Sequence, residues 1–545
     1  MYTMQLDWEG ALLLLGQALG MTLAARVLLH YFQLESYQFQ GYFRTVRRQW
    51  RKAAQPGALL AAVFIAVLVG SGFLWNGQGT LISLSTAVLT FGVGWSLHRW
   101  AAQTPQKKKF ALTARMKRLY AALFIVSLLL SLLAWLLMIR LQLAGIPGLI
   151  LSLLIIALPM LLLPCVAALA ALIALPIEKL IFHLYFKDAE KKLLENDRLI
   201  RIGITGSYGK TSTKFILAEI LAQKYNVLAT PASFNTPMGV TRIIRERLTP
   251  SHQVFIGEMG ARHVGEIKEL CRLVHPTIGI LTAVGPQHLD TFRTIDRIEK
   301  TKYELIDALP QDGLAVFMND EGIVKKLYDK TQKPKLLAAR DGADAWAEDV
   351  KVSPQGCSFT LHFKEGSAIP CETMLLGEHN VKNILAAALV ARHLGLTDAQ
   401  IARGVQALKP VEHRLQLIRT PGGIGVIDDA FNTNPRSSKE ALKVLSSFPG
   451  KRVIVTPGMV ELGEKEDEYN RDFGREMADK VDEAVLVGKR HTAPIRDGLK
   501  EMGFPEAKIH TVDSLEEAVA VVNGLIGPGD TVMYENDLPD HYSET

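Results

Sequence analysis

The chain has 545 residues, 48% of them hydrophobic, and carries 61 lysine and arginine residues against 55 aspartate and glutamate residues. At roughly 150 residues per domain this length predicts three to four domains, and the composition excludes a disordered, a collagen-like or a disulfide-scaffold chain. The cysteines form no CxxC pair, so we expect buried small hydrophobic residues and neither a zinc site nor a disulfide framework. They are Cys165, Cys271, Cys357 and Cys371.

The surplus of apolar residues lies almost entirely before residue 185. Five apolar stretches there are each long enough to cross a hydrocarbon core, which takes about 20 residues. The last of them contains Pro159 and Pro164 and is followed by Pro176, and we expect it to be kinked. The sequence therefore predicts an α-helical membrane domain of about five transmembrane helices over residues 1–176. The stretches are residues 10–31, 57–75, 79–97, 119–139 and 147–175.

Basic residues gather in two of the connections, 32–56 and 98–118, whereas Arg140 is the only basic residue in the other two. The positive-inside rule places both basic connections in the cytoplasm. With five spans, the N-terminus is then outside and the chain after residue 176 is inside. Topology and anionic membrane lipid account for the basic runs better than nucleic acid does, so we expect no nucleic-acid partner.

A charged amphipathic stretch, residues 177–198, follows and is expected to be a linker helix on the membrane surface. Beyond it, short apolar runs alternate with helical segments, a pattern typical of a parallel α/β sheet. We expect a central phosphate-loop domain over residues 199–408 and a smaller Rossmann-like C-terminal domain over residues 409–545. The strand-like runs are 200–205, 253–257, 277–282, 313–318, 424–428, 451–456, 483–487 and 530–534.

The strongest chemical motif, TGSYGKTST, directly follows the first of these runs and precedes a helical segment. In a phosphate loop, glycines let backbone N–H groups close around phosphate oxygens. Lys210 would neutralise the terminal phosphates, and the Thr211 hydroxyl would bind Mg²⁺. The spacing differs by one residue from the usual formula and an ordinary glycine turn is the alternative, but the strand and helix on either side favour the phosphate loop. Its expected nucleotide contacts are Gly206, Ser207, Gly209, Lys210, Thr211 and Ser212.

With this loop the chain resembles the Mur ligase superfamily, the amide-forming enzymes of peptidoglycan precursor synthesis, and most closely its MurF branch, which adds D-alanyl-D-alanine. The resemblance implies an ATP-dependent acid–amino-acid ligase that activates a carboxylate as an acyl phosphate, which an amine then attacks. The developing charge in such a reaction must be held by cations. Further matching segments follow in order: VFIGEMGARHVGEI at 254–267, AVGPQHLDTF at 283–292, EKTKYEL at 299–305, LLGEHNVKNILAA at 375–387, HRLQ at 413–416, IDDAFNTNP at 427–435 and GMVELG at 458–463.

Glu258 ends a strand-like run, where open α/β sheets place their ligands, and a carboxylate suits Mg²⁺. A solvated loop acid is the alternative for Glu258, and a structural histidine is the alternative for His288. The resemblance implies that His288 binds a second metal ion and that Lys302 is carbamylated and holds Mg²⁺. A surface lysine is the alternative for Lys302, and Lys300 is the competing candidate. Two Mg²⁺ ions are expected, with Thr211, Glu258, His288 and Lys302 as ligands and Lys210, Glu258, His288 and Lys302 as catalytic residues.

The resemblance also implies nucleotide contacts outside the phosphate loop. Arg414 would reach the phosphates and Asp429 the ribose when the two domains close, which would exclude water from a hydrolysable intermediate. Asp428 is the alternative to Asp429, and helix capping is the alternative role of the asparagines near residue 380. The remaining implied contacts are Asn319, Asn380 and Asn383 for ATP and Asn235 and Thr236 for the acceptor substrate.

Ordinary members of the superfamily begin with a soluble domain that holds the UDP of the acceptor, and here the apolar stretches stand in its place. Phe431 also stands where a tyrosine is usual. The acceptor is therefore expected to be a lipid-linked or UDP-linked carboxylate, and the amine an amino acid or a dipeptide. The alternatives are a poly-γ-glutamate-synthase-like ligase, a non-catalytic membrane scaffold with a relic ATP domain and an ATP-driven transporter. The scaffold predicts loss of the catalytic residues, all of which are present, and the transporter predicts charged residues deep in the spans, which are missing from the second to the fifth.

Overall fold

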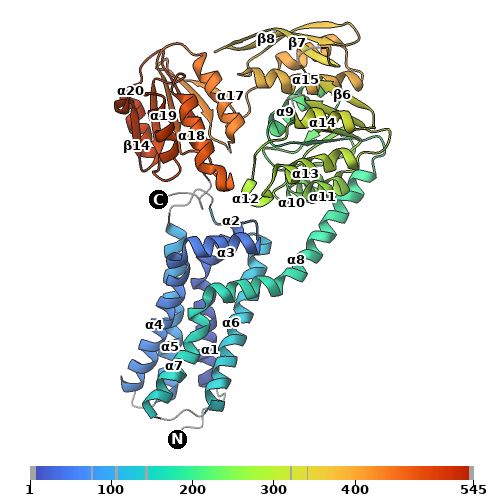
Figure 1. Cartoon of the computed structure of the whole chain (residues 1–545). Coiled ribbons are helices and arrows are strands. Elements are labelled where there is room, and N and C mark those ends of the chain that lie inside the picture. Colours follow the sequence, from blue (N-terminus) through green and yellow to red (C-terminus); the bar gives the residue numbers. More distant parts are fainter. Residues whose placement is uncertain are drawn as a thin grey trace. The chain divides into compact units, whose positions relative to one another are not determined.

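The computed structural model describes residues 8–74, 78–104, 109–141, 145–318, 322–339, 342–431 and 433–538. The chain forms two compact units, Met1–His183 and Leu184–Thr545, which we call the helical unit and the α/β unit (Figure 1). The expected fold class, a helical region followed by two sheet domains, is confirmed.

The helical unit consists of a bundle of long apolar helices. Four helices (α4, α5, α6 and α8) are long and apolar enough to cross a membrane, and the pair α1 and α2, bent by 41°, raises this number to as many as five in the described part of the chain. The helices are α1 (Trp8–Ala24), α2 (Arg26–Leu34), α3 (Phe39–Arg48), α4 (Trp50–Leu74), α5 (Gly79–Gln103), α6 (Ala114–Leu141), α7 (Gly145–Leu161) and α8 (Leu163–Leu194).

Helices α1 and α5 pack closely through small residues. A Cβ added at Gly16 would lie 2.5 Å from the Cα of Ala87, and one added at Gly94 would lie 2.5 Å from the carbonyl oxygen of Gly20. Because α1 and α5 run in the same direction along this contact, their N-terminal ends lie on the same side of the bundle. Such backbone-to-backbone approach through small residues is typical of helices that associate in lipid.

The fifth expected apolar stretch, 147–175, is divided between α7 and α8, which are separated at Leu162. Pro159 and Pro164 flank this break, and their ring nitrogens cannot donate the hydrogen bonds that a continuous helix needs. The expected linker helix is not a separate element either, because α8 continues without interruption to Leu194.

The first half of α8 contacts one side of the bundle at both of its ends. The Tyr42 hydroxyl, on α3, donates to the Pro164 carbonyl over 2.8 Å. Fourteen residues further on, Glu178 pairs with Arg118 at the start of α6 at 2.5 Å. The side chain of Gln33, at the end of α2, exchanges hydrogen bonds with Ala111, just before α6. The segment 163–178 of α8 therefore runs along the side of the bundle where the basic connections lie.

The α/β unit begins with a nine-stranded sheet in the order β2-β3-β1-β4-β5-β6-β7-β8-β9. Its strands are parallel from β2 to β7, and β7, β8 and β9 are antiparallel. The strands are β1 (Ile200–Thr205), β2 (Val227–Ala229), β3 (Val254–Glu258), β4 (Ile278–Leu281), β5 (Leu314–Met318), β6 (Lys335–Ala338), β7 (Ala345–Ser353), β8 (Gly356–Phe363) and β9 (Ala368–Thr373). The helices are α9 (Lys210–Leu221), α10 (Pro237–Arg247), α11 (Glu266–Val274), α12 (Leu289–Phe292), α13 (Ile295–Ala308), α14 (Ile323–Lys330), α15 (Glu378–His393) and α16 (Asp398–Gln406).

Both faces of this sheet are buried, because alternate strand residues point to opposite sides. On β3, Val254 and Ile256 join a core with α9, α15 and α16. Phe255, between them, joins a second core with α10, α11, α13 and α14, which cover the other face (Figure 1). The last turns of α8 also contribute to this second core, through Ala189 and Leu193. Helices on both faces explain why these strands are continuous apolar runs in the sequence.

The second sheet has the order β10-β11-β15-β12-β13-β14 and is parallel except for the pair β10 and β11. Helices α17, α18 and α19 cover one face and α20 covers the other. The strands are β10 (Gln416–Arg419), β11 (Gly425–Asp429), β12 (Arg452–Thr456), β13 (Glu483–Val487), β14 (Ile509–Val512) and β15 (Thr531–Glu535). The helices are α17 (Pro435–Ser446), η1 (Gly463–Lys465), α18 (Glu466–Met477), α19 (Ala493–Glu501), η2 (Glu506–Lys508) and α20 (Leu515–Leu525).

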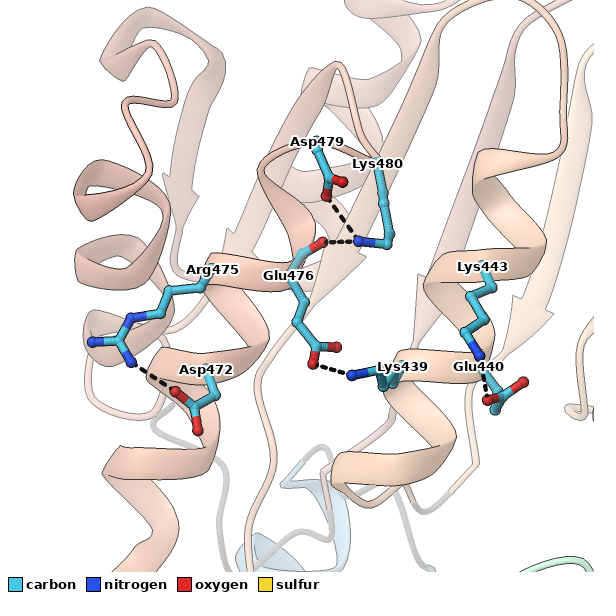
Figure 2. A network of polar contacts seen from close by, with 8 residues as sticks. All are labelled: Lys439, Glu440, Lys443, Asp472, Arg475, Glu476, Asp479 and Lys480. Atoms are coloured by element: carbon cyan, nitrogen blue, oxygen red, sulfur yellow. Dashed lines mark hydrogen bonds and ion pairs between the residues drawn. The ribbon is translucent and has the colours of Figure 1, made fainter. Parts of the chain in front are cut away.

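A network of charged side chains lies on the outer surface of α17 and α18 (Figure 2). Lys439 pairs with Glu476 at 2.8 Å and so joins the two helices. Exposed pairs of this kind each contribute about 0–1 kcal/mol, so the apolar core beneath them carries the stability of this region. Of the cysteines, three are buried as expected, but Cys165 is exposed on α8, and all four are free.

Candidate active site

The phosphate-loop motif lies at the carboxyl end of β1, in the middle of the parallel sheet. Strand β1 pairs with β3 on one side and with β4 on the other, so the chain leaves β1 at the point where the strand order reverses. Ligands of open α/β sheets bind in the crevice outside such a switch point. Gly209 is the N-cap of α9, which places the partial positive charge of the helix N-terminus at the loop.

Two glycines of the motif are required by the backbone. Gly206 has φ 151°, and a Cβ there would lie 2.0 Å from the Thr282 hydroxyl oxygen. Gly209 has φ 81°, in the left-handed region. Ser207 fastens the loop to the segment after β4, because its hydroxyl exchanges hydrogen bonds with the backbone of Gly285. The loop is therefore held by contacts that need these residues even before a nucleotide binds.

Lys210 begins α9 and points back over the loop. Its ammonium group donates to the carbonyl oxygens of Gly206 at 2.6 Å and Ser207 at 3.2 Å. Burial lowers the pKa of Lys210 to about 8, although Glu258 opposes this shift. Ser212 follows on the same turn and is half-buried. A cation held at a phosphate loop in this way is suited to the terminal phosphates of a nucleotide.

Glu258, at the end of β3, is the centre of a buried polar cluster and is 1% exposed. One of its carboxylate oxygens accepts from the Thr211 hydroxyl at 3.1 Å and from the Asn235 amide at 3.0 Å. The other pairs with Lys214 at 3.0 Å. Burial alone would raise the pKa of Glu258, but Lys214 and Lys210 outweigh it and hold this pKa below its usual value. Lys214, one helical turn after Lys210, was not predicted from the sequence.

Lys302 lies on α13 and is 2% exposed. Burial lowers its pKa well below the usual range, and the nearby Lys210 acts in the same direction. Lys302 also interacts electrostatically with Glu258 and His288. The competing candidate, Lys300, is exposed. The structure therefore brings Lys302, and not Lys300, to the group formed by Lys210 and Glu258.

His288 lies immediately before α12 with a left-handed backbone, φ 52°. Its Nδ1 forms a short hydrogen bond with the Glu461 carboxylate, which comes from the second sheet domain. Burial lowers the pKa of His288, and Glu461 opposes this shift. Glu461 also pairs with Arg262 at 3.2 Å. The GMVELG segment thus contacts the site, which was not predicted from the sequence.

The two asparagines of the HNxxN motif reach the same loop from α15. Asn383 accepts from the Thr213 hydroxyl at 3.2 Å and donates to Asn380 at 3.1 Å. Asn380 in turn donates to the Leu376 carbonyl. Neither is the helix cap, because the N-cap of α15 is Gly377. Thr236 does cap α10, by accepting from the Gly239 N–H group. Asn319 lies outside the described residues.

The second sheet domain also contributes Arg414 and Asp429. Arg414 stacks over the Phe431 ring at 4.1 Å and lies close enough to Lys210 to lower the pKa of that lysine. Burial and the nearby Glu535 raise the pKa of Asp429 to about 7. Asp429 accepts from the Leu415 N–H group, whereas Asp428 pairs with His413 at 2.8 Å. These contacts distinguish the two aspartates and leave Asp429 as the one beside Arg414.

The residues present fit a magnesium nucleotide. In the described ranges no three histidine, cysteine, aspartate or glutamate side chains converge as a metal cluster. Glu258 and Thr211 supply two converging oxygen donors. Magnesium in proteins is commonly bound by one or two carboxylates together with phosphate oxygens and water, so such an ion would bind here together with the phosphates.

The fold and this site define an ATP-using enzyme in which a phosphate-loop domain and a second α/β domain share one active site. Residues 204–391 match the Mur ligase middle domain, and residues 413–534 match the Mur ligase glutamate ligase domain. The chain belongs to the Mur ligase family and is an ATP-dependent ligase, as the sequence resemblance implied.

Among its relatives, the UDP-N-acetylmuramoyl-tripeptide–D-alanyl-D-alanine ligase of Mycobacterium bovis is 33% identical over 356 residues, which are 61% of this chain and 69% of that protein. The ligase of the same name from Bacillus subtilis is 29% identical over 338 residues, 61% of this chain and 72% of that protein. The crystal structure of MurF from Acinetobacter baumannii is 27% identical and covers 67% of this chain and 79% of its own, with a TM-score of 0.61. MurF from Thermotoga maritima in complex with ADP is 25% identical over 67% of this chain and 82% of its own, with a TM-score of 0.60.

Proposed function

We propose that this chain is a membrane-held, MurF-like ligase that uses ATP to join a carboxylate acceptor to an amino acid or dipeptide in peptidoglycan precursor synthesis. The observation that carries the proposal is the convergence of Lys210, Glu258 and Lys302 beside a phosphate loop. Activating a carboxylate requires transfer of the γ-phosphoryl group of ATP to a carboxylate oxygen, with ADP as the leaving group. The amine then forms the C–N bond, gives up a proton and displaces phosphate.

The nucleotide would be bound by groups from both domains. Lys210 and the backbone of the loop would bind the phosphates, and Arg414 would approach them from the other domain. Asp429 would bind the ribose. The arrangement excludes water only when the two domains lie together, which favours aminolysis over hydrolysis of the acyl phosphate. The remaining proposed nucleotide contacts are Gly206, Ser207, Gly209, Thr211, Ser212, Asn319, Asn380 and Asn383.

Magnesium would neutralise charge that develops on the transferred phosphoryl group. Thr211 and Glu258 would hold one ion, and His288 and Lys302 a second. Lys302 supports this proposal only in carbamylated form, because an ammonium group cannot bind a cation. Its burial and lowered pKa favour the neutral amine, whose nitrogen adds to the carbon of dissolved CO₂ and releases one proton. The product is an anionic carbamate with two oxygen donors.

The relatives act, by name, on a UDP-linked tripeptide and D-alanyl-D-alanine. For this chain we propose D-alanyl-D-alanine as the amine and a membrane-held, lipid-linked carboxylate as the acceptor, with Asn235 and Thr236 as contacts. The helical unit that precedes the ligase domains supports a lipid-linked acceptor. The alternative acceptor is the same carboxylate carried on UDP.

The decisive experiment supplies the full chain in lipid nanodiscs with ATP, Mg²⁺ and D-alanyl-D-alanine. One arm contains a UDP-linked muramoyl tripeptide and the other contains the same tripeptide on a polyprenyl pyrophosphate. Mass spectrometry of the product is expected to show the amide in the lipid arm. Product only in the UDP arm would reject the lipid-linked acceptor, and no amide and no ADP in either arm would reject the ligase.

For the helical unit we propose five crossings, α1 with α2, α4, α5, α6 and α7, with the N-terminus outside and the ligase domains in the cytoplasm. The first half of α8 then lies along the cytoplasmic face, which its contacts with Tyr42 and Arg118 favour. We propose the domain boundaries 1–176, 177–198, 199–408 and 409–545. Membrane-impermeant labelling of single cysteines is expected to modify residue 78 from outside only and residue 38 from inside only, and the reverse pattern would contradict the topology.

A further inference from the structure

Glu461 is a buried carboxylate that the second sheet domain presents to the first. It is 7% exposed and lies in the segment between β12 and η1. One of its oxygens takes the hydrogen bond from Nδ1 of His288, and the other pairs with Arg262 at 3.2 Å. Glu461 is 173 residues from His288 in the sequence, so only the packing of the two domains creates this contact.

The segment that carries Glu461 is fixed firmly to its own domain. Asn470 holds Met459 through two hydrogen bonds, of 2.8 and 2.9 Å, to the backbone N–H and carbonyl groups. Asn536 donates to the Gly458 carbonyl at 2.6 Å. These contacts make the position of the carboxylate a property of the whole domain and not of a loose loop.

Both partners of the contact have a backbone that ordinary residues avoid. Glu461 has φ 64° and His288 has φ 52°. A left-handed backbone is unfavourable for a non-glycine residue, and such conformations cluster at functional sites, where the surrounding structure enforces them. Two such residues meet side chain to side chain here, so the surrounding structure holds both ends of this contact in place.

We propose that Glu461 is a positioning residue that prepares His288 to bind a divalent cation. By accepting the hydrogen bond from Nδ1, it fixes the imidazole tautomer whose Nε2 lone pair is free of a proton, as a metal ligand requires. The ligating form of His288 then depends on the presence of the second sheet domain. This inference rests on the proposed function, which makes His288 a metal ligand.

A role of Glu461 as the base for the incoming amine is less consistent with its contacts. Both carboxylate oxygens already have a partner, and the guanidinium of Arg262 balances the charge. An acceptor of two hydrogen-bond donors stabilises their positions, which is what a carboxylate behind a metal-binding histidine does.

The test measures binding of Mn²⁺ to the full chain in nanodiscs containing ADP, by electron paramagnetic resonance. Glu461→Gln is expected to weaken the second Mn²⁺ site by about 10-fold, the lower end of the effect of such outer-sphere partners, while ADP binding without metal stays unchanged. Glu464→Gln, an exposed neighbour in the same segment, is the matched control and is expected to bind as the unmodified chain does.

His288→Asn completes the test, because the asparagine amide can still donate to Glu461 but offers no Nε2. In that background, Glu461→Gln is expected to cause no further loss. An undiminished second site in Glu461→Gln would overturn the inference, and so would an equal loss in the presence and absence of His288. If Glu461→Gln fails to fold, Glu461→Asp, which keeps the charge but not the reach, is expected to show the same loss. An unmodified chain that binds no Mn²⁺ with ADP would reject the proposed function itself.

Discussion

The two units of this chain bury polar groups of different kinds. In the described part of the helical unit, every buried polar side chain is uncharged or an imidazole, such as Gln17, Thr90 and Ser131. The α/β unit instead buries ionisable side chains, among them Lys214, Glu258, Lys302, Glu461 and Glu535. A buried charge costs several kcal/mol unless it is paired. The α/β unit therefore bears a cost that its paired and hydrogen-bonded partners must offset, whereas the described residues of the helical unit include no buried lysine, arginine, aspartate or glutamate.

The two units also differ in the interactions that stabilise them. Bundle contacts such as Gly16 against Ala87 depend on shape and not on charge. The contacts around Glu258 instead form a network in which each charged or polar group is paired with an opposite charge or a hydrogen-bond partner. Substitutions of charged residues should therefore be severe in the α/β unit and mild in the helical unit.

Lys214→Met is expected to have the largest effect. It leaves Glu258 buried without its nearest counter-charge, and breaking a buried pair in this way costs about 3–5 kcal/mol of unfolding free energy. Pulse proteolysis in urea, which reports the α/β unit by its intact fragment, measures this loss. Lys268→Met, at an exposed lysine, is the control. A loss below about 1 kcal/mol would mean that the pair behaves as a surface ion pair.

Lys210→Ala is expected to reduce ADP formation by about 10²–10³-fold, the effect of removing one group that stabilises charge in the transition state. Lys210 lies in the α/β unit, so membrane insertion and the amount of folded protein should not change. ADP release is followed by a coupled assay, with Lys268→Ala as the control. Undiminished turnover would contradict the assignment of the phosphate loop.

Lys302→Ala is expected to lower activity by at least about 10–100-fold, because loss of a proposed metal ligand should cost no less than loss of an outer-shell partner. Lys300→Ala, two residues away on the same helix but exposed, should leave activity unchanged. Mass spectrometry after trapping of carbamates should detect the modification on Lys302 and show it decrease when CO₂ is removed. Equal effects of the two substitutions would show that burial does not select the reactive lysine.

Sequence patterns predicted the parallel strands that are continuous apolar runs, because these strands are buried on both faces. The parallel strands β2, β6 and β14 were not predicted. The antiparallel strands β7, β8 and β9 of the first sheet and β10 of the second were not predicted either. In β9 (AIPCET) buried and exposed residues alternate, so the strand is not a continuous apolar run. Pro370 also argues against a strand, because proline cannot donate a hydrogen bond to a neighbouring strand. The break between α7 and α8 agrees with the kink expected from the prolines of this stretch, although hydropathy did not report that two separate helices lie within it.

The site was predicted where motifs carry it and missed where packing creates it. Lys210, Glu258 and Lys302 follow from the sequence because each belongs to a quoted segment. Lys214 had a detectable signal, since it lies on the face of α9 that also carries the buried Leu217 and Leu221. The contact between Glu461 and His288 had none, because it joins two domains and depends on their packing.

Glu178→Gln is expected to have the smallest effect. It tests whether a charged residue of the helical unit contributes as little as the comparison of the two units predicts. Glu178 is the carboxylate that holds α8 against the start of α6, through Arg118 at 2.5 Å and Arg115 at 3.5 Å. Arg118 is about one-third exposed, and pairs at a solvated surface contribute about 0.2–1 kcal/mol. Hydrogen exchange of the α8 amides should therefore accelerate only a few-fold around residue 178, with the rest of the bundle unchanged. Lys117→Met, an exposed neighbour of Arg118, is the control. Unfolding of the whole helical unit by Glu178→Gln would contradict the conclusion that this unit depends on shape and not on charge.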